Sequence, residues 1–362
     1  MRYIGEEEES ANGGNMKVNS NTEWGTLKEV ILGRAEYASI PKIKNKDIHC
    51  VDYANYDSVD DLPGGYYPDK IIEETTDDLN TFQKQLESIG IVVHRPDVID
   101  CSNGFSSPNW NSTGYYNYCP RDSVLAVGDT LIETPMPIRA RFFETYALRN
   151  IFKSYLKQGS KWISAPKPEL LDELYDRSEL SHASTLTEVE PAFDAANIVK
   201  CGKDLFYLVS NSGNKFGAAW LQTYLGDKYR VHILENVYAY VHLDTTIMPL
   251  AAGTVLLNPM RVNDNNLPEY FKTWKKIWCT EPIATPYHEN WAPASPWLGM
   301  NVLSLSDKLV AVEERQTNII KQLEDNGFDV MPVRMRHCRT LSGGPHCVTL
   351  DTVRDDEYGD YS

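Results

Sequence analysis

A ten-residue pattern occurs twice in the chain and constrains its fold more than any other feature. KQLESIGIVV begins at Lys84 and KQLEDNGFDV begins at Lys321, and both have a glycine three positions after the shared tetrad and a valine three beyond it. A glycine in this place is typical of the position just past the end of a helix, and the residues after it favour a strand. The chain is therefore predicted to repeat a helix-then-strand unit.

Three further segments follow the same pattern and bring the number of units to five. They are YALRNIFKSYLKQGSKWISAP from Tyr146, GAAWLQTYLGDKYRVHIL from Gly217 and LPEYFKTWKKIWCTEP from Leu267. Hairpin-like stretches separate the units, with turn residues between two apolar runs. These stretches are SVLAVGDTLIET, NIVKCGKDLFYLV, TTIMPLAAGTVLLN and NVLSLSDKLVAVEE.

A fifth hairpin is divided between the two ends of the chain. Its halves are TLKEVILG near the start and CVTLDTV near the end, and pairing them would close five modules into a ring without sheet edges. We predict an α/β protein with one such domain over residues 19–354, an acidic disordered extension over 1–18 and an acidic tail over 355–362. The alternative is an ordinary α/β protein in which the repeats are coincidental.

Charge and composition exclude several classes of partner and location. The 35 Lys and Arg residues against 51 Asp and Glu give −16, which disfavours nucleic acid and favours a cationic small molecule. The N-terminus, MRYIGEEEES, has no apolar signal region, and Met16 is an alternative start. No run is long enough to cross a membrane. Seven cysteines without C-x-x-C spacing predict reduced thiols in a soluble, cytoplasmic protein.

A polar residue immediately precedes each predicted hairpin. Each one alone has an ordinary explanation as a cap, a turn residue or a buried core group. Because they recur at one place in the repeat, we expect them to converge at one end of the ring. The residues are Asp122 in CPRD, Asp194 in EPAFDAAN, His242 and Asp244 in VHLD, Asn301 in GMN, and Cys347 in GGPHC.

This set of side chains suits the chemistry of a planar cation. Carboxylates such as Asp122 and Asp244 grip a guanidinium group through its five N–H donors, and a thiolate can then attack its central carbon. A cysteine protease is the alternative, but it does not need the extra carboxylates. His346 is a poor base for Cys347, because adjacent residues face opposite ways on a strand. The histidines lack metal-ligand spacing, so we expect no metal.

At these residues the sequence resembles the L-arginine amidinotransferases, a group that includes glycine amidinotransferase, inosamine-phosphate amidinotransferase and cyanobacterial enzymes of guanidino-toxin pathways. The resemblance runs from about Asn19 to Arg354. It implies a five-bladed α/β-propeller, or pentein fold, and transfer of the amidino group of arginine to an amine. The motifs that carry it are NTEWGTLKEVILGRAE, STGYYNYCPRD, ETPMPIRARFFE, APKPELLDELY, EPAFDAAN, HLDTT, NPMRVN and GGPHC.

The resemblance also implies a role for each site residue. Cys347 is the nucleophile that carries the amidino group, His242 is the general acid and base, and Asp194 orients its imidazole. Asp122 and Asp244 hold the guanidinium, and Arg261 with Ser295 binds the arginine carboxylate. The resemblance implies L-arginine and a small amine as substrates, no cofactor, and a homodimer. A transfer in two steps through one covalent enzyme predicts ping-pong kinetics.

The acceptor amine is the least constrained part of the prediction. We expect glycine, with an inosamine phosphate or another biosynthetic amine as the alternative, and water, as in an arginine deiminase, as a third. A phosphate acceptor calls for nearby cations, and only Arg334, Arg336 and Arg339 cluster in the sequence. Three departures from the family pattern bear on the identity of the acceptor. They are Pro345 before His346, Asn197 in place of an Asp, and the stretch Tyr238-Ala239-Tyr240.

Overall fold

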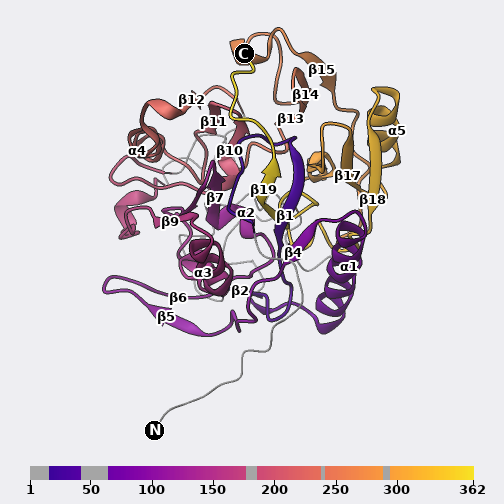
Figure 1. Cartoon of the computed structure of the whole chain (residues 1–362). Coiled ribbons are helices and arrows are strands. Elements are labelled where there is room, and N and C mark those ends of the chain that lie inside the picture. The colour runs from indigo at the N-terminus through magenta and orange to yellow at the C-terminus, as the bar shows by residue number, and fades with distance from the viewer. Residues whose placement is uncertain (1–15, 42–63, 177–185, 238–240, 288–293) are drawn as a thin grey trace.

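Five small sheets arranged around a common axis form the body of the protein (Figure 1). The structure is a computed structural model, and it describes residues 16–41, 64–176, 186–237, 241–287 and 294–362. Each of the five sheets has three strands, in which an antiparallel pair is followed by a parallel third strand. This is the five-module α/β architecture that the repeat predicts.

Four of the sheets follow the chain in order, and each predicted hairpin is confirmed. Their strands are β7 (Val124–Val127), β8 (Thr130–Glu133) and β9 (Lys161–Ser164); β10 (Ile198–Cys201), β11 (Asp204–Leu208) and β12 (Arg230–Leu234); β13 (Ile247–Ala251), β14 (Thr254–Leu257) and β15 (Lys275–Trp278); and β16 (Leu303–Ser304), β17 (Leu309–Glu313) and β18 (Asp329–Val333).

The ends of the chain complete the fifth sheet, as the divided hairpin predicts. Strand β1 (Thr26–Leu32) pairs antiparallel with β19 (Thr349–Asp355), with Ile31 opposite Leu350, and parallel with β4 (Val92–His94). Ile31 and Leu350 belong to a buried cluster with Phe152 and with strands β7 and β8 of the next module. Pairing of the two ends therefore completes one module of the ring, and this module packs against the next one along the chain.

Helices precede the third strand in four modules and lie on the outside of the ring (Figure 1). They are α1 (Asp69–Ser88), α3 (Arg149–Lys157), α4 (Lys215–Leu225) and α5 (Thr317–Asp325). The two glycines of the repeated pattern, Gly90 and Gly327, follow α1 and α5 with φ of +85° and +92°. Their left-handed conformation ends each helix, as the sequence predicts.

The fifth predicted helix, in LPEYFKTWKKIWCTEP, is wrong. Only one 3-10 turn forms there, η8 (Glu269–Phe271), and the predicted strand follows it as β15. Phe271 and Trp274 are buried in this segment and pack edge to face at 5.2 Å, and Phe271 also contacts Phe206 of β11. Bulky rings thus cover this module in place of a helix, and Pro268 precedes the short turn.

Four other short strands and a one-turn helix lie outside the five sheets. They are the short pairs β2 (Ser39–Ile40) with β3 (Gly65–Tyr66) and β5 (Gly104–Ser106) with β6 (Asn111–Thr113), and the one-turn helix α2 (Pro120–Ser123). Among the described residues, no helix is long and apolar enough to span a bilayer.

Both acidic ends adjoin the ring where they are described. Most of the predicted 1–18 extension lies outside the described residues, but Val18 is buried at 2% exposure. In the 355–362 tail, the Asp356 carboxylate accepts hydrogen bonds from the backbone amides of Asn21 and Thr22, and Tyr361 packs against Trp24 at 5.1 Å. The described part of the tail is therefore held against the ring.

Candidate active site

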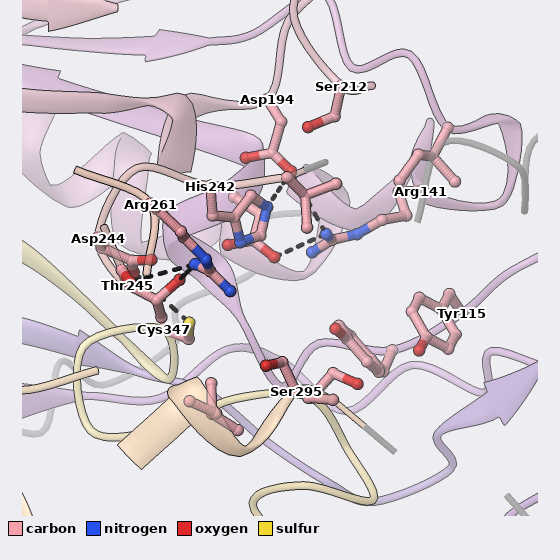
Figure 2. A pocket seen from close by; sticks show the side chains of 17 residues that line it. Tyr115, Arg141, Asp194, Ser212, His242, Asp244, Thr245, Arg261, Ser295 and Cys347 are labelled. Atoms are coloured by element: carbon pink, nitrogen blue, oxygen red, sulfur yellow. Dashed lines mark hydrogen bonds and ion pairs between the residues drawn. The ribbon is translucent and has the colours of Figure 1, made fainter. Parts of the chain in front are cut away.

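The segments that lead into the first strand of each hairpin meet in one pocket. All seven predicted site residues line it, and Figure 2 shows six of them by label: Asp194, His242, Asp244, Arg261, Ser295 and Cys347. Asp122 lies in α2 just before β7, Asp194 precedes β10, and Cys347 lies just before β19. The expected convergence is thus seen: residues more than 200 positions apart in the chain line the same pocket.

His242 and Asp194 form a hydrogen-bonded pair at the centre of the pocket (Figure 2). The Nε2 atom of His242 lies 2.8 Å from Oδ2 of Asp194, and the other carboxylate oxygen accepts the backbone N–H of Ala196. Asp194 is thereby the N-cap of a 3-10 turn, η6 (Ala195–Asn197). His242 has φ of +60°, a conformation that non-glycine residues rarely adopt. Its backbone N–H donates to Asn197 Oδ1.

Asn301 fixes the loop that carries Cys347. Its Oδ1 atom accepts the backbone N–H groups of His346 and Cys347 at 3.1 and 2.9 Å, and its amide donates to Asp244 Oδ2 at 2.7 Å. Cys347 Sγ lies 3.6 Å from that same oxygen. One amide side chain therefore sets the position of the thiol relative to the carboxylate.

Asp122 and Asp244 share an unusual feature: each has one bonded and one unbonded carboxylate oxygen. Asp122 Oδ2 accepts from Arg141 Nη1 at 2.7 Å, and Asp244 Oδ2 lies 2.8 Å from His346 Nδ1. The Oδ1 atoms of both residues are buried and have no hydrogen-bond partner among the described residues. Buried polar atoms are nearly always paired, so these two unpaired acceptors in one pocket are candidate contacts for hydrogen-bond donors of a ligand.

Reactive groups in the pocket lie close together. The ligating atoms of His242, Asp244 and Cys347 are all within 4.8 Å of one another, as are those of Asp122, Asp194 and His242. Such sets could also hold a metal ion. However, Asp122 Oδ2 and Asp244 Oδ2 already contact Arg141 and His346, and our expectation of no metal stays a prediction.

The electrostatic environment of the pocket shifts the pKa values of His242 and Cys347. Burial lowers the pKa of His242, but the charges of Asp194 and Asp122 outweigh it and raise that pKa well above its ordinary value. Contact with the Cys119 thiol and burial raise the pKa of Cys347, and the Asp244 carboxylate acts in the same direction. The ligand-free pocket therefore favours an imidazolium beside a neutral thiol.

The two carboxylates differ in their ease of protonation. Burial, and then the nearby charge of Asp194, raise the pKa of Asp122. Burial also disfavours ionised Asp244, but the hydrogen bond from His346 and the charges of His346 and His242 lower its pKa to about 2. Asp244 thus stays ionised at any working pH, whereas Asp122 is the more readily neutralised of the two.

Arg261 and Ser295 lie on the pocket wall, as predicted. Arg261 Nη1 donates to the carbonyl and hydroxyl oxygens of Thr245 and to the Thr246 hydroxyl, at 3.0 to 3.1 Å. Ser295 Oγ caps the 3-10 turn η9 (Pro296–Met300) by accepting the backbone N–H of Trp297. Both side chains are therefore held in place at the pocket wall by the protein itself.

The sequence analysis gave no role to Arg141, which lines the same pocket. Its guanidinium contacts Asp122, lies 3.9 Å from Asp194 Oδ2 and bonds both oxygens of Glu144 through Nε at 2.9 Å. The only available signal was the motif ETPMPIRARFFE, which places Arg141 beyond the hairpin without indicating which carboxylate it meets.

The predicted basic cluster does not lie in the pocket lining. Arg334 and Arg336 pair with Asp77 and Asp78 of α1. Arg339 is buried and donates to the backbone carbonyls of Ala294 and Thr285. The stretch Tyr238-Ala239-Tyr240 lies outside the described residues.

Comparison with known proteins confirms the resemblance over nearly the whole chain. Inosamine-phosphate amidinotransferase 1 of Streptomyces glaucescens is 44% identical over 338 residues, which cover 93% of this chain and 97% of that protein. The chain belongs to the amidinotransferase family. Mitochondrial glycine amidinotransferase of Gallus gallus is 38% identical, over 92% of this chain and 82% of that protein. A scan of protein-family models finds none that matches.

Solved structures agree with this family and with its fold. The inosamine-phosphate amidinotransferase of Streptomyces griseus superimposes with a TM-score of 0.92 at 42% identity, covering 96% of this chain and 99% of that one. A Pseudomonas aeruginosa protein titled DDAH reaches a TM-score of 0.55 at 15% identity, over 90% and 99% of the two chains. This chain therefore has the pentein-type α/β fold, which it shares with both of these proteins.

Proposed function

We propose that this amidinotransferase moves the amidino group of L-arginine to a biosynthetic amine through a covalent intermediate on Cys347. The observation that carries the proposal is the pair of unpartnered oxygens, Asp122 Oδ1 and Asp244 Oδ1, in the pocket that Cys347 lines. A guanidinium offers N–H donors in one plane, which suits two carboxylates. Held between them, its central carbon can face the sulfur.

The first half-reaction forms one bond and breaks another at that carbon. The Cys347 thiolate attacks the guanidino carbon, and the bond from this carbon to the side-chain nitrogen of arginine breaks as His242 donates a proton to that nitrogen. Ornithine then leaves. The imidazolium is available because Asp194 and Asp122 raise the pKa of His242, and Asp194 fixes the ring orientation.

The guanidinium of the substrate supplies the positive charge that stabilises the Cys347 thiolate. In the free pocket Cys347 is disfavoured as a thiolate, partly because of the Asp244 carboxylate beside it. A guanidinium bound to Asp122 and Asp244 neutralises these charges and adds a cation next to the sulfur, which lowers the cost of ionisation. We infer that at neutral pH the thiol releases its proton to solvent, and so becomes the nucleophile, only when arginine is in place.

The second half-reaction regenerates the imidazolium and the thiolate, and the thiolate then takes a proton from solvent to return the enzyme to its starting state. The acceptor amine attacks the amidino carbon, neutral His242 takes up a proton from the amine, and the carbon–sulfur bond breaks to release the Cys347 thiolate. One imidazole thus gives a proton in the first step and takes one in the second. Arg261 and Ser295 bind the arginine carboxylate in this scheme.

For the acceptor, we propose an inosamine phosphate or a similar amine rather than glycine. The amidinotransferases at 43–44% identity are named for inosamine phosphate, whereas the glycine enzyme stands at 38%. Tyr115, Tyr116, Ile138 and Leu298 line the pocket as well and offer contact area that glycine cannot use. Arg261, vacated by the departing ornithine, is the cation that we assign to the acceptor's anionic group.

Cys347→Ser should abolish the covalent intermediate, because the serine hydroxyl ionises far less readily than a thiol. With arginine labelled at the guanidino carbon, mass spectrometry of quenched wild-type protein should find the label on the peptide that contains Cys347. The control is Cys279→Ser, another buried thiol, whose hydrogen bond goes to Thr280 O. It should keep the label. Turnover without labelled Cys347 would contradict covalent catalysis.

L-arginine should bind more weakly as the pH falls, because Asp122, whose pKa is raised, loses its charge on protonation while Asp244 keeps its own. In Cys347→Ala protein, titration calorimetry should give a Kd that rises as the pH falls through the raised pKa of Asp122. Adding Asp122→Asn should weaken binding by about 1.5–3 kcal/mol and remove this dependence. Asp172→Asn, at an exposed partner of Arg139, is the matched control. If the Asp122 variant kept the dependence, the assignment would fail.

A panel of amines tests the acceptor assignment. Arginine is supplied with an inosamine phosphate, the unphosphorylated inosamine, lysine or glycine, and ornithine release is measured. We expect kcat/KM to be highest for the inosamine phosphate, with ornithine formed only when an amine is present. A higher value for glycine would overturn the acceptor proposal and support the glycine prediction. Citrulline and ammonia formed without any amine would instead identify a hydrolase.

A further inference from the structure

His346 is buried between two carboxylates, and neither the transfer chemistry nor the comparisons give it a role. Its Nδ1 atom lies 2.8 Å from Asp244 Oδ2, and its Nε2 atom lies 3.3 Å from Glu23 Oε2. The side chain is 2% exposed, and its two carboxylate neighbours are also buried. The imidazole therefore bridges the pocket to a group that lies outside the pocket lining.

Both neighbours are ionised acceptors. Burial opposes the charge of Glu23, but Lys200 and the hydrogen bond from His346 lower the pKa of Glu23 to about 2. The pKa of Asp244 is also lowered to about 2, against burial, chiefly by the hydrogen bond from His346. A carboxylate can only accept, so each of the two ring nitrogens must carry a proton. Hydrogen bonds from both ring nitrogens to carboxylates thus correspond to the doubly protonated, cationic form of His346.

A set of buried ion pairs holds this arrangement on the side away from the pocket. Arg121 Nε donates to the carbonyl of His346, and Arg121 Nη2 bonds Asp351 Oδ1 at 2.6 Å. Arg121 Nη1 also lies 3.8 Å from Glu23 Oε2. Lys200 Nζ and Arg354 Nε both donate to Asp351 Oδ2, at 3.0 and 2.7 Å. The three cations Arg121, Lys200 and Arg354 face two carboxylates, those of Glu23 and Asp351.

The position of His346 matters because of what Asp244 Oδ2 contacts next. That oxygen accepts from His346 and from Asn301, and it lies 3.6 Å from Cys347 Sγ. A thiolate this close to a buried carboxylate is repelled, and the repulsion is strong where water is excluded. A cation bound to the same carboxylate oxygen offsets that repulsion.

We propose that His346 is a positioning residue, a buried cation that ties Asp244 to Glu23 and so allows Cys347 to form a thiolate beside Asp244. The proposal rests on the proposed role of Cys347 as the nucleophile. It differs from a structural role, in which His346 only fills space and holds Asp244 in place. It also keeps His346 out of proton transfer, because both of its ring protons are bonded to carboxylates.

His346→Asn tests the proposal, because the Asn side chain offers Asp244 a neutral donor near the place of Nδ1 but no charge. The measurement is the rate at which iodoacetamide alkylates Cys347 as a function of pH, read from the peptide that contains Cys347, without substrate. We expect the midpoint to move up by about one pH unit, a tenfold lower rate at a fixed pH below it. His337→Asn, which removes an imidazole paired with Glu74, should leave the profile unchanged.

Because His346→Asn could fail to fold, a measurement on the wild-type protein accompanies it. Nitrogen NMR of histidine-labelled protein at neutral pH should show both ring nitrogens of His346 protonated, with the signals assigned by loss in a second variant, His346→Gln. A single protonated ring nitrogen, or an alkylation profile of a folded His346→Asn protein that matches the wild type, would overturn the proposal. Neither readout needs turnover, so each remains decisive even if the amidino transfer reaction is wrong.

Discussion

The site depends on two buried carboxylates that each keep one oxygen free. Arg141 binds one oxygen of Asp122, and His346 with Asn301 binds one oxygen of Asp244, which leaves the two Oδ1 atoms unpaired. Unpaired buried acceptors cost free energy, of the order of 1–3 kcal/mol each. In the proposed function, a guanidinium that binds between them recovers that cost.

The closed ring is what brings these groups together. Six of the seven site residues lie on segments that lead into the first strand of a hairpin, and these strands lie toward the inside of the ring; Arg261 instead follows β14. Pairing of β1 with β19 places Cys347, near the end of the chain, beside residues from the middle of it. Burying charges on this scale is costly, and it is tolerated because each bonded carboxylate oxygen meets a donor of the protein.

The modules, and the meeting of the predicted site residues in one pocket, could be predicted from the sequence because both follow a local pattern. The glycines after α1 and α5, the hairpin turns and the polar residue before each hairpin can be read from short segments. The fifth predicted helix does not form, because Phe271 packs against Trp274 and against Phe206, which is distant in the sequence. Apolar spacing alone does not distinguish a helix from such a packed irregular segment. Spacing likewise does not reveal that Arg141 meets Asp122 or that His346 meets Glu23, since the partners are 19 and 323 positions apart in the sequence.

The central claim is that Asp122 and Asp244 hold a guanidinium with its carbon against the sulfur of Cys347. A crystal structure of the Cys347→Ala protein with L-arginine tests it most directly. The account predicts that the guanidinium donates to Asp122 Oδ1 and Asp244 Oδ1, with its central carbon above the Cβ atom of residue 347. Arginine bound with its guanidinium away from either carboxylate would contradict it.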